Sequence, residues 1–191
     1  MKKILFCRFC KSNKLVDVIN LGKQSLTGVF PKNVKDKVTR GPLIVALCKN
    51  CSLLQLRHSY NMEELYGLNY GYRSSLNSSM VNHLRNKAIT LVKNYKITKK
   101  DFIIDIGSND GTLFNFFKNY KNLIGVDPTI AKFKKNYNKE ITQIEDFFPS
   151  NILNSKIKLK KAKLITSFSM FYDLEDPFEF SCQIKKMLTS D

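Results

Sequence analysis

The second half of the chain alternates short apolar runs with segments of helical pattern. Each run has the length of a buried strand, and the runs cover residues 102–106, 122–127, 141–144 and 163–168. Helices are predicted to begin at Thr112 and Thr129, and Asp176 followed by Pro177 marks the start of a third. Strands that alternate with helices in this way predict an α/β fold with a doubly wound sheet.

The first half of the chain has a different pattern. Its predicted strands are short, separated by loops that contain Gly and Pro, and cover residues 15–22, 43–47 and 53–56. A short helix follows, with Asn61 as N-cap and Gly67 at its end. Apolar positions at helical spacing then predict a long amphipathic helix over residues 77–95, which we expect to pack against the sheet.

Composition and the N-terminal residues indicate where in the cell the protein is expected. The chain has 191 residues and 43% hydrophobic content, which is enough for a core. No apolar run approaches the roughly 20 residues that a membrane span needs. The basic start, Met1–Arg8, lacks a sustained apolar region and a cleavage site for a signal peptide. We therefore expect a cytoplasmic protein without a membrane partner.

The net charge of +16 raises the question of a nucleic-acid partner. Lysine supplies 27 of the 32 basic residues and arginine only 5, while asparagine occurs 18 times. Lysine and asparagine spread along the whole chain indicate coding bias and solvated surfaces, whereas phosphate-reading surfaces concentrate arginine. We therefore do not expect nucleic acid as the partner. A basic surface also suits a small anionic substrate such as a sugar nucleotide.

Four of the five cysteines form two C-x2-C pairs, Cys7 with Cys10 and Cys48 with Cys51, separated by 37 residues. Two such pairs supply the four thiolates of tetrahedral zinc. A disulfide needs an oxidising compartment, and a redox C-x2-C explains one pair better than two. The sequence therefore predicts a closed, structural Zn²⁺ site. Cys182 lies outside both pairs and is expected to be a buried thiol.

A glycine-bracketed turn follows the strand at 102–106. Gly107 and Gly111 allow a ligand to approach the backbone, as in sites for nucleotide-like ligands. Asp127 ends the next strand, 22 residues after Asp105, where doubly wound folds place an acid that accepts hydrogen bonds from ribose hydroxyls. The dinucleotide fingerprint GxGxxG is absent, because Asn109 and Thr112 stand at two of its glycine positions.

The pattern D-x-G-x-N-x-G followed by G-V-D resembles motifs I and II of class I S-adenosylmethionine-dependent methyltransferases. The resemblance implies S-adenosylmethionine as cofactor, with Asp127 holding the ribose. Gly107 and Gly111 would admit the methionine part, and Asp105 would orient its amino group. Asn109 of the turn is a further donor-binding candidate.

The order of motifs along the chain is more specific. Two C-x2-C pairs, a Tyr-x-Tyr-x-Ser segment before a long helix, and then D-I-G-S-N-D-G and G-V-D-P resemble the zinc-containing C-methyltransferases of nucleotide-deoxysugar pathways. In that family a tyrosine of the connector lines the active site and neighbouring hydroxyls help to hold the donor. By position these roles fall on Tyr72 as catalytic residue, and on Ser75 and Tyr70. Packing at a domain junction is the alternative role for the tyrosines.

Two later segments complete the expected donor site. An acid with a neighbouring aromatic residue after the third strand resembles the family's adenine contact, which would fall on Asp146 and Phe147. A polar turn with buried Phe side chains is the alternative. The loop after the fourth strand would lie over the sulfonium end of the donor, because open α/β sheets bind ligands beyond the carboxyl ends of their strands. Ser167 is the candidate there.

The resemblance also predicts what the chain lacks. Members of the family continue through a further domain that carries a Glu-His motif with the catalytic base, and no Glu-His pair occurs here. We therefore expect a Rossmann-like class I sheet that is incomplete at its C-terminus and a doubtful turnover by this chain alone. The expected parts are a β-rich zinc-binding domain, a helical connector contributing to the active site, and an S-adenosylmethionine-binding domain, at residues 1–58, 59–99 and 100–191.

The leading hypothesis is the N-terminal part of a methyltransferase that acts on carbon of a small nucleotide-linked keto-deoxysugar. One alternative is a zinc-ribbon nucleic-acid-binding protein that keeps a non-catalytic methyltransferase-like half. Another is a methyltransferase with a different acceptor, such as RNA or a small metabolite.

Overall fold

The structure is a computed structural model that describes residues 1–157 and 160–190. Positions 158, 159 and 191 of the expected third domain lie outside the described residues. The chain forms two compact units. The N-terminal unit comprises Met1–Gly71 and Tyr172–Glu179, and the sheet unit comprises Tyr72–Phe171 and the residues from Phe180 onward. The expected connector, residues 59–99, is therefore divided between the two units.

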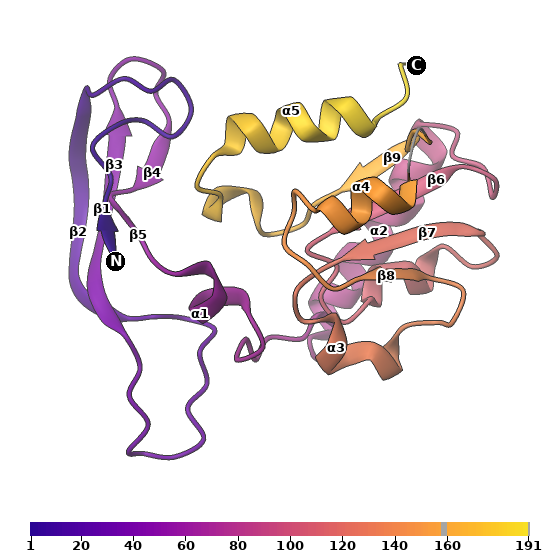
Figure 1. Cartoon of the computed structure of the whole chain (residues 1–191), viewed down its shortest axis with the longest axis horizontal. Coiled ribbons are helices and arrows are strands. Elements are labelled where there is room, and N and C mark those ends of the chain that lie inside the picture. The colour runs from indigo at the N-terminus through magenta and orange to yellow at the C-terminus, as the bar shows by residue number, and fades with distance from the viewer. Residues whose placement is uncertain (158–159, 191) are drawn as a thin grey trace. The chain divides into compact units, whose positions relative to one another are not determined.

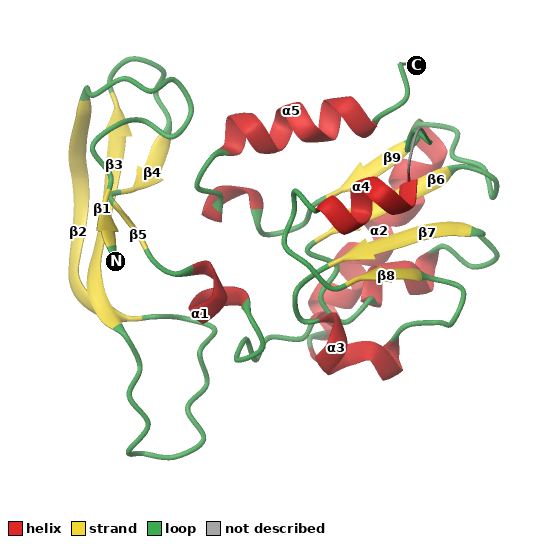
Figure 2. Cartoon of the chain, viewed as in Figure 1, coloured by secondary structure: helices red, strands yellow, loops and turns green. Residues whose placement is uncertain are grey.

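The N-terminal unit is built from antiparallel strands (Figures 1 and 2). A three-stranded sheet has the order β2-β3-β4, and β1 pairs separately with β5. Their bounds are β1 Lys2–Lys3, β2 Leu15–Ser25, β3 Arg40–Cys48, β4 Leu54–Leu56 and β5 His58–Ser59. The three strands predicted for this half are confirmed. Helix α1 (Met62–Tyr66) follows, and its predicted N-cap is confirmed because the Asn61 side chain accepts from the backbone N–H groups of Glu63 and Glu64.

The sheet unit contains four parallel strands, which confirms the predicted α/β fold. Strand β6 (Phe102–Ile106) lies between β7 (Asn122–Val126) and β9 (Leu164–Thr166), and β8 (Thr142–Ile144) pairs with β7. In chain order this arrangement is 3-2-1-4. The order reverses between β6 and β9, and this switch point is where doubly wound sheets bind their ligands.

Both faces of the sheet are apolar and covered. On one face Leu123, Ile103 and Leu164 stand in one row across three strands and pack with Leu84 and Ala88 of α2 (Ser78–Asn94). The other face carries the alternate residues of the strands, and Figure 1 shows α4 (Asn151–Ile157) over it. The remaining helical segments are η1 Ser74–Leu76, α3 Ile130–Phe133, η3 Lys134–Asn136, η4 Phe171–Asp173 and α5 Pro177–Met187.

Helix lengths depart from the prediction at two crossovers. The segment expected to open a helix at Thr112 forms only the short 3₁₀ helix η2 (Thr112–Phe116), and the second crossover contains only α3 and η3. Ten residues separate Gly111 from Asn122 and must recross the height of the sheet. A 3₁₀ helix rises about 2.0 Å per residue against about 1.5 Å for an α-helix, so it spans that distance with fewer residues.

Among the described residues, no helix combines the length and the apolar character that crossing a bilayer requires.

Candidate functional site

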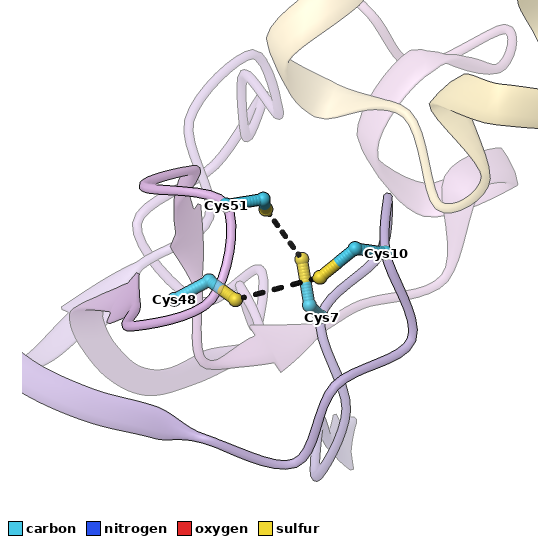
Figure 3. Close-up of side chains that lie close together, drawn as sticks. All are labelled: Cys7, Cys10, Cys48 and Cys51. Carbon is cyan, nitrogen blue, oxygen red and sulfur yellow. Dashed lines mark hydrogen bonds between the residues drawn. The ribbon is translucent and has the colours of Figure 1, made fainter.

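The four cysteines predicted to bind zinc lie together in the N-terminal unit (Figure 3). All four sulfur atoms lie within 4.8 Å of one another, and the pairs Cys7–Cys51 and Cys10–Cys48 are each 3.6 Å apart. Tetrahedral zinc with Zn–S bonds of about 2.3 Å requires sulfur–sulfur distances of about 3.8 Å. The donor set and its spacing therefore fit Zn²⁺, and four thiolates leave no open coordination position for catalysis.

Both cysteine pairs sit on the same type of backbone loop. The Cys7 N–H donates to Ser12 O at 2.7 Å, and the Cys48 N–H donates to Leu53 O at 2.9 Å. Lys11 and Ser52, which directly follow the second cysteine of each pair, adopt positive φ values of 59° and 61°. Hydrogen bonds from Ser12 and Asn50 lower the pKa of the Cys10 thiol to about 6, which favours the thiolate that a metal needs.

Arg8, between the first two cysteines, is buried and was not identified from the sequence. Its backbone N–H donates to Gln55 Oε1 at 2.8 Å, and its guanidinium donates to Ser59 Oγ at 2.9 Å and to Leu174 O at 3.0 Å. Burial lowers the pKa of Arg8, and the charge of Glu175 opposes this. Arg8 thus joins the first cysteine loop to segment 172–179 of the same unit.

In the sheet unit, the turn after β6 bends back to the end of β7. Gly107, Asn109 and Gly111 have positive φ values of 74°, 51° and 75°. The Gly107 N–H donates to Val126 O at 2.8 Å, and the Asn109 N–H donates to Asp127 Oδ2 at 2.9 Å. The Asp127 carboxylate therefore faces the turn, as the two motifs would require if they form one site.

The Asp127 carboxylate also holds the start of the next segment. Its Oδ1 accepts from the Thr129 N–H at 2.7 Å and from the Thr129 hydroxyl at 2.5 Å. Burial raises the pKa of Asp127, while these bonds and the one from Asn109 oppose the shift. Each carboxylate oxygen can accept more than one hydrogen bond, so the group keeps acceptor capacity for a ligand hydroxyl.

Tyr137 holds the turn through hydrogen bonds of its hydroxyl group and was not identified from the sequence. Its hydroxyl lies 2.8 Å from Ser108 Oγ and donates to Asn109 O at 2.8 Å. A Cβ added at Gly111 would lie 3.0 Å from the Tyr137 ring, and one added at Gly107 would lie 3.2 Å from Met170 Sδ. Both glycines therefore combine a positive φ with close neighbours, and a side chain at either position would disturb the turn.

Asp105 lies within β6, one residue before the strand ends. It is 4% exposed and accepts from the Thr166 hydroxyl of β9 at 2.6 Å. Burial raises its pKa to about 7, although the bond from Thr166 opposes the shift. Burial therefore favours the protonated form of this carboxyl group, which lies in the strand that leads into the turn.

The structure brings part of the expected connector to this turn. The Asn109 side chain binds the backbone at Tyr72 and Ser74, and the Asp110 side chain accepts from the Ser75 N–H at 3.1 Å. Tyr72 and Ser75 are thus adjacent to the turn, and Tyr72 is 36% exposed. Neither Asp110 nor its ion-pair partner Arg73, 3.7 Å away, was among the residues identified from the sequence.

Tyr70 belongs to the N-terminal unit instead. It forms a β-bridge with Val29 and a ring contact with Tyr66, and a Cβ at Gly28 would collide with its ring. These are packing contacts, so a role of Tyr70 in donor binding stays a prediction.

The last three candidates follow the carboxyl ends of β8 and β9. Asp146 and Phe147 form a local turn in which the Phe147 N–H donates to Asp146 Oδ1 at 2.8 Å. Ser167 directly follows β9, and its buried hydroxyl has no hydrogen-bond partner among the described residues. A buried hydroxyl without a partner at the ligand-binding edge of a sheet has capacity for a ligand.

A groove of about 600 Å³ lies elsewhere in the sheet unit. It lies between the crossover after β6 and the segment before β8, and Lys118 and Glu140 are among the residues that line it. Among the predicted site residues only Gly111 lines it.

Residues 7–66 match the family model Methyltransf_13, described as "Putative zinc binding domain". Over 125 residues the chain is 31% identical to the C-methyltransferase NovU of Streptomyces niveus, a match that covers 64% of this chain. The matched segment spans only 30% of the length of that relative.

Solved structures give weaker similarities. The plantazolicin methyltransferase BpumL, in complex with a triazolic desmethylPZN analog and SAH, has a TM-score of 0.46 at 19% identity, covering 61% of this chain and 46% of that one. Precorrin-6y C5,15-methyltransferase from Geobacter metallireducens has a TM-score of 0.42 at 14% identity and covers 63% of both chains. The fold assignment therefore rests on the parallel strand order of the sheet unit.

The four-cysteine cluster, the family match that begins at Cys7 and the strand order 3-2-1-4 agree with one another. Residues 7–66 match the zinc-binding domain of the Methyltransf_13 family, and the chain continues into a Rossmann-like parallel sheet and is similar to a C-methyltransferase over 125 residues.

Proposed function

We propose that the sheet unit binds S-adenosylmethionine at the carboxyl edge of β6, β7 and β9. The observation that carries this proposal is the hydrogen bond from the Asn109 N–H to Asp127, which joins the turn and the acid of the two motifs in one site. The residues present fit the donor, because the turn after β6 keeps two glycines with positive φ and the buried Ser167 hydroxyl at the end of β9 has no hydrogen-bond partner among the described residues.

The proposed roles follow from what each group can donate or accept. Asp127 accepts hydrogen bonds from the ribose hydroxyls, and Ser167 and the turn hold polar groups of the methionine part. Asp146 and Phe147 are proposed to contact the adenine. The donor supplies an electrophilic methyl group, and the residues of this chain bind and orient it. Tyr72 is proposed to face the methyl acceptor from the segment next to the turn.

We further propose that the methylated atom is a carbon of a nucleotide-linked keto-deoxysugar. Similarity to a C-methyltransferase supports the carbon acceptor. The order of zinc pairs, Tyr-x-Tyr-x-Ser segment and donor motifs supports the sugar class. The four-cysteine site has no part in the chemistry, because its coordination is closed.

Isothermal titration with S-adenosylmethionine tests the donor site. Asp127→Asn keeps the size of the side chain but removes its charge and one acceptor oxygen, so we expect affinity to fall about 10- to 100-fold. Glu140→Gln, the matched change at the amino end of β8, should leave affinity unchanged. Equal affinity in Asp127→Asn and the unaltered protein would overturn the proposal. So would the absence of donor binding together with DNA binding that weakens steeply with salt.

A further inference from the structure

We propose that Asn109 and Asp110 are positioning residues that hold the connector segment, Tyr72 to Ser75, against the donor turn, so that donor binding and the placement of Tyr72 are coupled. This inference rests on the proposed function for the identity of the donor. The hydrogen bonds that carry it are independent of any ligand.

Asn109 uses both ends of its side-chain amide on the connector segment. Its Nδ2 donates to Tyr72 O at 3.0 Å, while its Oδ1 accepts from the Ser74 N–H at 3.0 Å and from the Ser74 hydroxyl at 3.4 Å. The amide thus pairs with the backbone of residues 72 and 74 much as a neighbouring strand would. Only 8% of Asn109 is exposed, so water competes little for these bonds.

Asp110 adds a charged contact to the same segment. Its side chain is fully buried; Oδ2 accepts from the Ser75 N–H at 3.1 Å and lies 3.7 Å from Arg73 Nε. The other oxygen accepts from the Thr112 hydroxyl at 2.6 Å. A buried carboxylate needs partners of this kind, so displacing the connector segment would leave Asp110 poorly satisfied. The Arg73 guanidinium also lies over the Phe133 ring, 5.5 Å from its centre.

The same asparagine connects the segment to the acid of the donor site. The Asn109 N–H donates to Asp127 Oδ2, and the Asn109 φ of 51° places its backbone in the left-handed region. A ligand that engages Asp127 therefore acts on the residue whose side chain holds Tyr72 and Ser74. Part of the segment is open to solvent, since Tyr72 is 36% exposed and Ser75 is also exposed. We expect the segment to open locally more readily than the strands, and bound donor to suppress that opening.

An arginine-specific protease reports this opening, because Arg73 stands within the segment. In Asn109→Gly the left-handed backbone is tolerated and the side-chain bonds are lost. Cleavage after Arg73 should then become about fivefold faster, as expected for the loss of a net hydrogen bond of average strength. Asn119→Gly is the matched control, since Asn119 also has a positive φ, of 66°, and is exposed outside the segment. Asp110→Asn tests the charged contact and should also accelerate cleavage.

The protease experiment is then repeated with S-adenosylmethionine. In the unaltered protein, saturating donor should slow cleavage after Arg73 several-fold, and the protection should shrink in Asn109→Gly. Equal cleavage rates in Asn109→Gly, Asp110→Asn and Asn119→Gly would overturn the positioning role without reference to any donor. Donor binding in the titration with no protection of Arg73 would overturn the coupling. Absence of donor binding would overturn the proposed function and, with it, the coupling, while the ligand-free rates still decide the positioning role.

Discussion

Asp105, Asp110 and Asp127 place three carboxyl groups in the interior around one turn. Each has a hydroxyl donor on a neighbouring threonine, at 2.5 to 2.6 Å. Such bonds compensate part of the cost of burying a charge. Asp105 has the fewest donors of the three, and its pKa is raised to about 7. The folded protein therefore keeps the Asp105 carboxyl group protonated at pH values at which the unfolded chain would have released the proton.

The stability of the sheet unit should depend on this proton. Because the pKa of Asp105 rises from 3.8 unfolded to about 7 folded, its favourable contribution is complete below about pH 4 and is lost as pH rises through 7. Across this range the free energy of unfolding should fall by up to about 1.4 kcal/mol for each pH unit, because the unfolded chain releases this proton first. Asp105→Asn should abolish this fall. Urea unfolding at several pH values measures the slope. Asp36→Asn, in an exposed loop, is the control, and an unchanged slope in Asp105→Asn contradicts the prediction.

At the scale of elements, the long helix α2 depends on a local signal at its start. The Asn77 side chain accepts from the backbone N–H groups of Ser79 and Met80 at 3.0 and 3.4 Å. The buried face of the helix, at Leu84 and Ala88, then packs on the sheet. The cap fixes where the helix begins, and therefore where the connector segment that precedes it ends.

Removing this cap should destabilise the helix by a predictable amount. Asn77→Ala leaves two N–H groups without their partner, and we expect a loss of about 1 kcal/mol in the free energy of unfolding. Asn82→Ala makes the same change on the exposed surface of the same helix, where alanine should be neutral or slightly stabilising. Chemical denaturation of both variants checks the difference. Equal stabilities would show that packing alone sets the start of α2.

The sequence could predict those features that depend on residues close together in the chain. The Ile-rich strand at 102–106, the cap at Asn61 and the two cysteine pairs each depend on residues a few positions apart. The contacts that were missed join distant residues. Asn109 to Ser74 spans 35 positions and Arg8 to Leu174 spans 166. No local sequence pattern shows that a polar side chain has such a distant partner, because the same residue at a surface turn would have the same neighbours in sequence.

At the scale of the whole molecule, the N-terminal unit has little apolar core of its own. Val16, Val18 and Leu21 of β2 are among its large exposed hydrophobic residues. The buried members of its core include Cys7 and Cys48, which are zinc ligands by their geometry. A small module with so few buried side chains depends on its metal, because binding energy becomes folding energy when the site exists only in the folded state.

Zinc removal should therefore unfold this unit. The purified protein is expected to contain one Zn²⁺ per chain, and a strong chelator should release it together with a loss of β structure in the circular dichroism spectrum. Cys48→Ser should lose the metal, whereas Cys182→Ser, outside the cluster, should retain it. Metal analysis of both variants decides the assignment. Full zinc content in Cys48→Ser would show that the cluster is not the binding site.

The bonds of Arg8 to Leu174 and of Lys11 to Asp176 have a consequence for the newly made protein. Along the chain the first cysteine loop precedes the four parallel strands, whereas the segment that covers Arg8 follows them. During synthesis the guanidinium of Arg8 therefore stays hydrated until those strands have been made. The N-terminal unit completes its fold only after that point, although its cysteine loops are made first.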